Sequence, residues 1–241
     1  MENKENISKE PYSGKQMAKP LYDISPFTLL DYPDKTACIF WFVGCNMRCL
    51  YCYNPDIVFG KGKISLDDAI NFLISRKELL QAVVFSGGEC SAHPDLLVMA
   101  RKAKSLGYLV KVDTNGLRPD VITKMLKEGL IDYVSLDFKG LGENFKKITG
   151  STSFGKFEET LFLLLDTDMP FEVRTTVHSQ LLSPHDLMEM LSYLESCSYR
   201  GNYYLQPSLN NVKMISELNH STFDSDILKL KSKNINIKLR K

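Results

Sequence analysis

The stretch TACIFWFVGCNMRCLYCYNP, residues 36–55, joins an apolar, β-rich run to a polar loop with three cysteines. Cys45, Cys49 and Cys52 have the spacing C-x3-C-x2-C, so their thiolates can converge on one metal centre. A [4Fe–4S] cube normally takes four cysteines, and three leave one iron with an open coordination position. Because a catalytic metal needs an open position, the spacing favours a reactive iron–sulfur cluster.

A structural zinc site is the alternative interpretation of these cysteines. It needs a fourth ligand, which Cys90 or a histidine could supply, and it gains nothing from an open position. We expect Cys90 to be a small loop residue and Cys38 to be part of the core, and Cys197 receives no role. Crowding of three cysteines in a reducing compartment favours metal binding over disulfides.

Outward from this loop, apolar, β-rich runs alternate with helical segments. Ser65 and Asp68 indicate a helix start, and Leu187 with its neighbours predicts a helix over 184–196. Such alternation predicts parallel βα units with right-handed crossovers. The runs span residues 36–43, 82–86, 108–113, 132–137, 171–177, 202–206 and 235–239.

These units define an α/β fold, which we expect to be a partial, open-sided (β/α)6 barrel. Eight units would close a full barrel in about 250 residues, whereas about six remain here. A doubly wound open sheet is the alternative. In either fold the loops that follow the strands share the face at the carboxyl ends of the strands, where such folds place their chemistry.

Length and composition limit the domain organisation, the partners and the location that we expect for this protein. The 241 residues suit a flexible tail over residues 1–20 and a single domain over 21–241. A formal net charge of +1 gives no reason to expect nucleic acid or a membrane as partner. The polar N-terminus lacks the apolar segment of a secretory signal, so we expect a cytoplasmic protein.

Three further motifs lie where successive strands end, and Arg174 lies on the strand that follows them. The residues are Gly-Gly-Glu at 87–89, Asp-Thr-Asn-Gly at 113–116, Asp-Phe-Lys at 137–139, and Arg174. Each has an ordinary structural interpretation as well, because Gly-Gly and Asn-Gly are common turns and a lysine can form a surface ion pair. The register of the sheet decides whether Arg174 points into the barrel or toward the helices.

Taken together, the motifs resemble those of the radical S-adenosylmethionine (SAM) superfamily. CNMRCLYC has the three-cysteine spacing of that family, with aromatic Tyr51 before the third cysteine. LLDYPDKTACIFWFVGC and the following CxxxCxxCxNP resemble the activating proteins of anaerobic ribonucleoside-triphosphate reductase, within the glycyl-radical enzyme activating enzymes. The chain departs from those relatives at Tyr53, usually histidine, and at Cys90, usually proline.

The resemblance implies a [4Fe–4S] cluster on Cys45, Cys49 and Cys52, with SAM on the open iron. It also implies a monovalent cation held by Asp and Thr side chains beside SAM, and Gln206 near the adenine. The residues that it assigns to the cofactor site are Tyr51, Gly87, Gly88, Glu89, Asp113, Thr114, Asp137, Lys139 and Arg174.

By the same resemblance, the protein would cleave SAM reductively under anaerobic conditions. The resulting 5′-deoxyadenosyl radical would remove a hydrogen from a glycine of a glycyl-radical enzyme, here anaerobic ribonucleotide reductase, with flavodoxin as an electron donor. No catalytic residue beyond the cluster and SAM is expected. The alternatives are an activator of pyruvate formate-lyase, a radical SAM enzyme acting on a small molecule such as 7-carboxy-7-deazaguanine synthase, and a zinc-stabilised binding module without enzymatic activity.

Overall fold

The computed structural model describes residues 19–222 and 225–240, which fold around one eight-stranded sheet. The strands lie in chain order; β1 runs antiparallel to β2, and every later neighbouring pair is parallel. The strands are β1 Leu21–Thr28, β2 Ala37–Phe42, β3 Ala82–Gly87, β4 Leu109–Thr114, β5 Tyr133–Asp137, β6 Phe171–Val177, β7 Asn202–Pro207 and β8 Asn236–Leu239.

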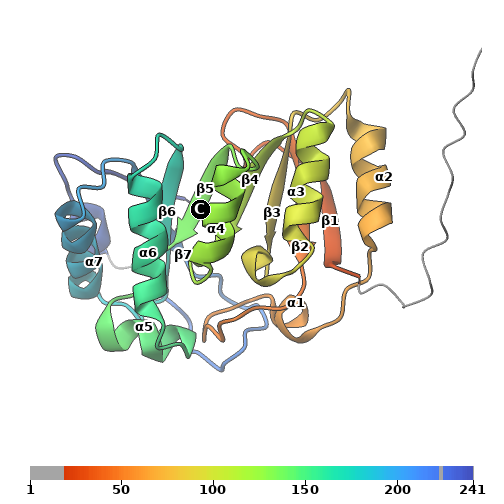
Figure 1. The fold of residues 1–241 in the computed structure, drawn as a ribbon. Coiled ribbons are helices and arrows are strands. Elements are labelled where there is room, and N and C mark those ends of the chain that lie inside the picture. Colours follow the sequence, from red (N-terminus) through yellow and green to blue (C-terminus); the bar gives the residue numbers. More distant parts are fainter. Residues whose placement is uncertain (1–18, 223–224, 241) are drawn as a thin grey trace, which may run out of the picture.

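Helices connect the parallel strands and lie on the outer face of the curved sheet (Figure 1). Two of them, α1 and α5, lie instead at the end of the sheet where the parallel strands finish. The helices are α1 Pro55–Phe59, α2 Leu66–Arg76, α3 Leu96–Ser105, α4 Pro119–Lys127, α5 Gly142–Thr149, α6 Phe154–Leu165 and α7 Pro184–Ser196, with 3₁₀ turns η1 Cys90–Ala92 and η2 Ser225–Lys229. No helix in the described part of the chain combines the length and the apolar character needed to cross a bilayer.

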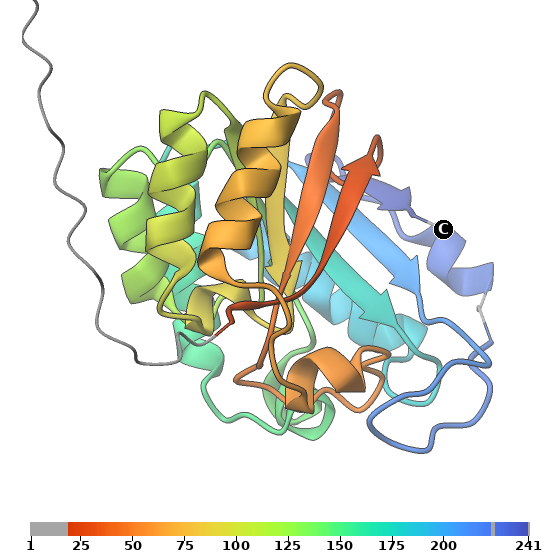
Figure 2. The same cartoon turned by 90° about the vertical axis from the view of Figure 1, so that its right-hand side faces the viewer.

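The sheet curves into a barrel that stays open on one side. Its edges are β1 and β8, and no ladder joins them among the described residues. Figure 2 shows the curvature from the red β1 round to the blue C-terminal strands. The predicted class, an open-sided α/β barrel, is therefore confirmed, with six connections between its seven parallel strands.

β1 is the one strand that lies outside the predicted runs. Along it only Leu21 is buried, and Pro26 has no N–H to donate. An exposed edge strand of this kind lacks the apolar signal of the buried parallel strands. The tail predicted for residues 1–20 lies, apart from residues 19 and 20, outside the described residues.

Two helices begin with the reciprocal hydrogen bonds of a capping box. At α2, Ser65 Oγ accepts from the Asp68 N–H at 3.1 Å, and the Asp68 carboxylate accepts from the Ser65 N–H at 3.4 Å. At α7, Ser183 and Asp186 make the same pair of bonds at 3.2 and 2.7 Å. These bonds satisfy N–H groups that a helix start leaves without partners, and α7 has the predicted bounds.

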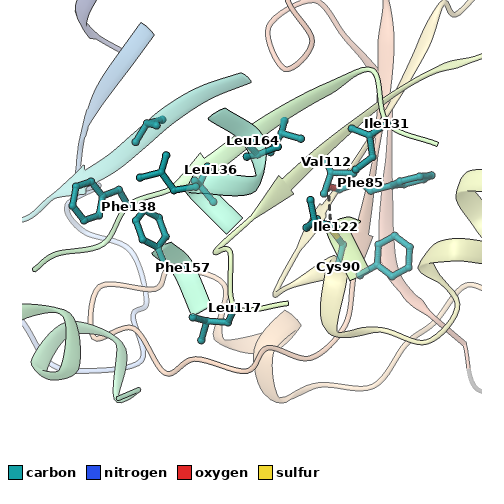
Figure 3. Packing of buried hydrophobic residues seen from close by; sticks show 14 of the residues in the cluster. Phe85, Cys90, Val112, Leu117, Ile122, Ile131, Leu136, Phe138, Phe157 and Leu164 are labelled. Carbon is teal, nitrogen blue, oxygen red and sulfur yellow. Dashed lines mark hydrogen bonds between the residues drawn. The ribbon is translucent and has the colours of Figure 1, made fainter. Parts of the chain in front are cut away.

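Two apolar clusters form the core, and the polar side chains lie at the carboxyl ends of the strands. The larger cluster lies between the sheet and its helices, where Phe138 stacks on Phe157 with ring centroids 5.0 Å apart (Figure 3). A smaller cluster includes Ile39 and Val84 near the start of the parallel strands. Polar side chains such as Asp113 occupy the other end, so the fold directs its charged groups to the carboxyl ends of the strands.

Candidate cofactor site

The loop after β2 brings its three cysteines to one cavity of about 240 Å³ at the carboxyl ends of the strands. Cys45, Cys49 and Cys52 all line this cavity, and none of them forms a disulfide. The Cys52 N–H donates to the Cys49 carbonyl at 3.0 Å, which closes a tight turn between the two thiols. The chain thus presents three thiols to one cavity.

Backbone hydrogen bonds fix this loop against the end of α5. The Arg48 N–H donates to the Thr149 carbonyl at 2.8 Å, and the Leu50 N–H donates to the Ile148 carbonyl at 2.9 Å. These carbonyls belong to the last turn of a helix, where they lack partners within the helix. The cysteine loop therefore supplies the missing donors and gains a fixed position.

Burial controls the acid–base state of the thiols. Burial, and after it the Glu89 carboxylate, raises the pKa of the Cys45 thiol to about 12. Burial also raises the pKa of the Cys49 thiol. Both groups are therefore protonated at neutral pH when no metal is bound, and binding of iron must displace these protons.

Gly87 and Gly88 let the end of β3 approach the cysteine loop closely. Gly87 has a φ of +120°, and a Cβ there would lie 2.3 Å from the Phe42 carbonyl oxygen. A Cβ on Gly88 would lie 2.0 Å from the Gly44 carbonyl oxygen. Both distances are shorter than real contacts, so this pair of glycines has a packing reason that is independent of any ligand.

Glu89 is a buried carboxylate with neutral hydrogen-bond donors around it. Its Oε1 accepts from the Ser91 hydroxyl at 2.5 Å and from the Thr114 hydroxyl at 2.8 Å, while its Oε2 accepts from the Asn115 N–H at 2.6 Å. Burial raises the pKa of Glu89 although these bonds oppose the shift. Glu89 lines the cavity, whereas Thr114 lies behind it and orients it.

Two carboxylates and two cations form the charged wall of the cavity. Arg174 donates to Asp137 Oδ1 at 2.9 Å and to Asp113 Oδ2 at 3.3 Å, and Lys139 Nζ lies 3.3 Å from Asp137 Oδ2. Burial opposes ionisation of Asp113, but the charges of Arg174 and Lys111 outweigh it and lower its pKa to about 2. Burial likewise opposes ionisation of Asp137, and Arg174 and Lys139 lower its pKa. The wall is charged at neutral pH.

Lys139 and Tyr51 connect this wall to the cysteine loop. Burial disfavours the Lys139 ammonium, yet Asp137 raises its pKa well above the usual range. The ammonium nitrogen lies 5.9 Å from the centroid of the Tyr51 ring. The Tyr51 hydroxyl is buried and has no hydrogen-bond partner among the described residues. A buried polar atom without a partner beside a cavity indicates a missing ligand.

The structure brings together almost every residue that the sequence assigns to the site. Thr114 is the exception, since it supports Glu89 rather than lining the cavity, whereas Gln206 does line it. Arg174 points into the barrel, which its sequence position alone leaves open. The sequence interpretation misses several lining residues, because their inward direction depends on the strand register or on the course of the loops: Trp41, Ser86 and Thr176 on strands, and Met47 and Asn115 on loops.

Cys90 belongs to the core, as expected for a small loop residue. Its thiol donates to the Phe85 carbonyl and approaches the Asp113 carbonyl, both at 3.4 Å (Figure 3). The side chain is fully buried and does not line the cavity of the three cysteines. Cys90 therefore offers no fourth ligand to that loop in this structure.

The donor set fits an iron–sulfur cluster and the space beside it fits a ligand. One metal ion shared by three ligands needs ligand atoms that lie close together. Among the described residues, only His185, Asp186 and Glu189 form a group of three whose ligand atoms all lie within 4.8 Å of one another, so the three thiols do not form such a group. The three thiols are spaced more widely than one shared zinc ion at about 2.3 Å from each sulfur requires. Three separate irons of a cube suit such spacing, and the cavity extends from the thiols to the charged wall.

Comparison with known proteins identifies the class to which this fold and site belong. The sequence profile of the radical SAM superfamily matches residues 39–194, which include the cysteine loop and five parallel strands from β2 to β6. The chain belongs to the radical SAM superfamily, whose cofactors are a [4Fe–4S] cluster and SAM.

Two relatives indicate a branch of this superfamily. A Methanocaldococcus jannaschii protein, named provisionally as a glycyl-radical enzyme activating enzyme, is 29% identical over 80% of this chain and 81% of its own length. The pyruvate formate-lyase-activating enzyme of Clostridium pasteurianum is 30% identical over 56% of this chain and 59% of its own length. The first relative matches most of the chain and the second a little over half of it, and both support the resemblance to activating enzymes.

Solved structures confirm the fold. SuiB of Streptococcus suis bound to S-adenosylmethionine matches with a TM-score of 0.66 at 12% identity, covering 83% of this chain and 48% of that chain. The structure of anSMEcpe with bound AdoMet gives 0.60 at 20% identity, covering 77% and 56%. The chain spans about half the length of these structures, so the likeness concerns the shared barrel.

Proposed function

We propose that this protein is an activating enzyme that generates a glycyl radical on anaerobic ribonucleoside-triphosphate reductase. The observation that carries the proposal is the match, over four fifths of both chains, to a protein named provisionally as a glycyl-radical enzyme activating enzyme. The resemblance of residues 29–55 to reductase activators supports the choice of partner. Flavodoxin as electron donor, anaerobic conditions and a cytoplasmic location belong to the same proposal.

In this proposal the chain holds the cluster through Cys45, Cys49 and Cys52. Glu89 Oε2 accepts one hydrogen bond from the protein and has room for another, which suits the amino group of SAM. The Lys139 ammonium suits the SAM carboxylate, because charge-assisted hydrogen bonds are strong where water is excluded.

Three further side chains complete the proposed SAM site. Tyr51 offers a free hydroxyl, Gln206 lines the cavity beyond the charged wall, and Arg174 holds that wall in place. When bound, the cluster and SAM supply the one-electron chemistry. The protein itself orients them and shields them from water.

The open side of the barrel supports a macromolecular substrate. The cavity extends from the cysteine loop to Trp41 of β2, Gln206 of β7 and Asp31 beside β1, on either side of the gap between the sheet edges. A flexible loop of a partner protein can reach the cofactor site through such a gap.

The test combines the reduced, cluster-loaded protein with SAM and the reductase under anaerobic conditions. Electron paramagnetic resonance should detect a glycyl radical on the reductase, and none when the Cys49→Ala variant replaces the wild type. Cleavage of SAM without any radical on the reductase would contradict the choice of partner.

Pyruvate formate-lyase is the second candidate partner, favoured by the 30% identity to the clostridial activator. The same experiment with pyruvate formate-lyase in place of the reductase separates the two proposals. A radical on the lyase but not on the reductase would mean that the lyase, and not the reductase, is the substrate. A third arm without any protein partner tests for chemistry on a small molecule.

A further inference from the structure

Lys111 is a buried lysine near the middle of β4, close to the cofactor site but outside the motifs of the sequence. It is 1% exposed, and it lies in register between Val84 of β3 and Tyr133 of β5. Its ammonium donates to Asp113 Oδ1, and no other hydrogen-bond partner of that ammonium occurs among residues 19–222 and 225–240. The buried ammonium of Lys111 therefore has the Asp113 carboxylate as its partner.

Every carboxylate oxygen of Asp113 and Asp137 has a cationic partner. Asp113 binds Lys111 through Oδ1 and Arg174 through Oδ2. Asp137 binds Arg174 through Oδ1 and Lys139 through Oδ2. A monovalent cation between these carboxylates would share their oxygens with cations that the chain already supplies.

The charge balance argues in the same direction. Two carboxylates face three cations, so the group carries a surplus of one positive charge. The carboxylate of SAM would neutralise that surplus, whereas a bound K⁺ or Na⁺ would increase it. The group around Asp113 and Asp137 therefore favours an anionic group over a K⁺ or Na⁺ ion, and Glu89, elsewhere on the cavity lining, is left for the amino group of SAM.

Thr114, the other residue assigned to the cation by resemblance, has its hydroxyl engaged elsewhere. It donates to Glu89 Oε1 at 2.8 Å and accepts from the Gly116 N–H at 3.1 Å. The side chain is 1% exposed and lies behind the cavity wall. Its hydroxyl therefore offers little to an ion between the two carboxylates.

We propose that the ammonium of Lys111 takes the place of the monovalent cation, so that SAM binding by this protein needs no K⁺ or Na⁺. Lys111 acts through Asp113 and is a positioning residue. The inference rests on the proposed placement of SAM beside Asp137 and Lys139, and it does not depend on the identity of the partner enzyme.

The test measures the Kd of SAM for the cluster-loaded, full-length protein by anaerobic equilibrium dialysis. Solutions of KCl, NaCl and tetramethylammonium chloride are compared at equal ionic strength, because tetramethylammonium is too large for a cation site. The proposal requires the three Kd values to agree within about twofold. Binding that is tighter by about tenfold or more in KCl or NaCl would overturn it.

Variants of Lys111 make the test specific. Lys111→Gln removes the charge, so we expect SAM binding in tetramethylammonium to weaken by about tenfold and to recover in part with K⁺. Lys111→Arg keeps the charge and should keep the independence from salt. Lys104→Gln, which removes a lysine paired with Asp132 outside the cavity, is the matched control and should behave as wild type.

Each outcome separates this inference from the proposed function. A Lys111→Gln variant that binds SAM like the wild type in all three salts would refute the role of the ammonium. If that variant does not fold, the wild-type and Lys111→Arg salt series still decide the question. Absence of SAM binding in every salt would refute the placement of SAM and this inference with it, while the radical assay reports separately on the partner.

Discussion

Gly88→Ala tests the close contact between β3 and the cysteine loop. An added Cβ would lie 2.0 Å from the Gly44 carbonyl oxygen and 3.2 Å from the Cys45 Cβ, whereas real contacts of this kind exceed 3.0 Å. The two loops must therefore separate by about 1 Å, an overpacking that costs about 1–3 kcal/mol. The separation also strains the hydrogen bond from the Glu89 N–H to the Gly44 carbonyl at 2.9 Å, worth about 0.5–1.5 kcal/mol.

We therefore expect Gly88→Ala to lower the free energy of unfolding of the cluster-free protein by about 2–4 kcal/mol. Chemical denaturation followed by circular dichroism measures this value. Because Cys45 moves with Gly44, the iron content after reconstitution should also fall clearly below that of the wild type.

Gly155→Ala is the matched control. No atom lies within 4 Å of a Cβ built at Gly155, which is exposed in the first turn of α6, so alanine should be neutral or stabilise by up to about 1 kcal/mol. Full iron content and unchanged stability in Gly88→Ala would refute the packing explanation of this glycine.

Three further substitutions, with Cys49→Ala as the comparison for the first, test separate parts of the structure. Cys90→Ala should keep the full iron content, whereas Cys49→Ala should lose it, as iron and sulfide analysis would show. Arg240→Ala leaves the buried Glu172 carboxylate without its cation and should lower the free energy of unfolding by about 3 kcal/mol. Ser183→Ala removes the cap of α7 and should cost about 1 kcal/mol, measured by denaturant unfolding, without a change in iron content.

Contrary results would be informative for each substitution. Loss of iron in Cys90→Ala would restore a ligand role for that residue. A cost for Arg240→Ala no larger than that for Arg101→Ala, whose partner Glu128 is partly exposed, would mean that the buried pair contributes little. An iron deficit in Ser183→Ala would imply that α7 positions the site.

The positions of the parallel strands could be predicted because buried parallel strands are rich in apolar and β-branched residues. Runs such as 82–86 and 171–177 mark their strands closely, and the motifs at their ends then share one face. β1 could not be predicted in the same way, since it is an exposed edge strand.

Side-chain partners across the sheet depend on register, which the sequence does not display. Asp137 and Arg174 are direct neighbours in the β5–β6 ladder, and this pairing turns both toward the cavity. Glu172 and Arg240 lie 68 positions apart and meet only because β8 completes the sheet. Lys111 stands out in an apolar strand, yet only the fold reveals its carboxylate partner.

The central claim is that Cys45, Cys49 and Cys52 hold a cluster whose open iron binds SAM. The most direct measurement is electron paramagnetic resonance of the reduced protein with and without SAM, alongside iron and sulfide analysis. We predict about four irons per chain and a spectrum that SAM changes, with both properties lost in Cys49→Ala. Zinc without acid-labile sulfide, or a cluster spectrum that SAM leaves unchanged, would contradict the claim.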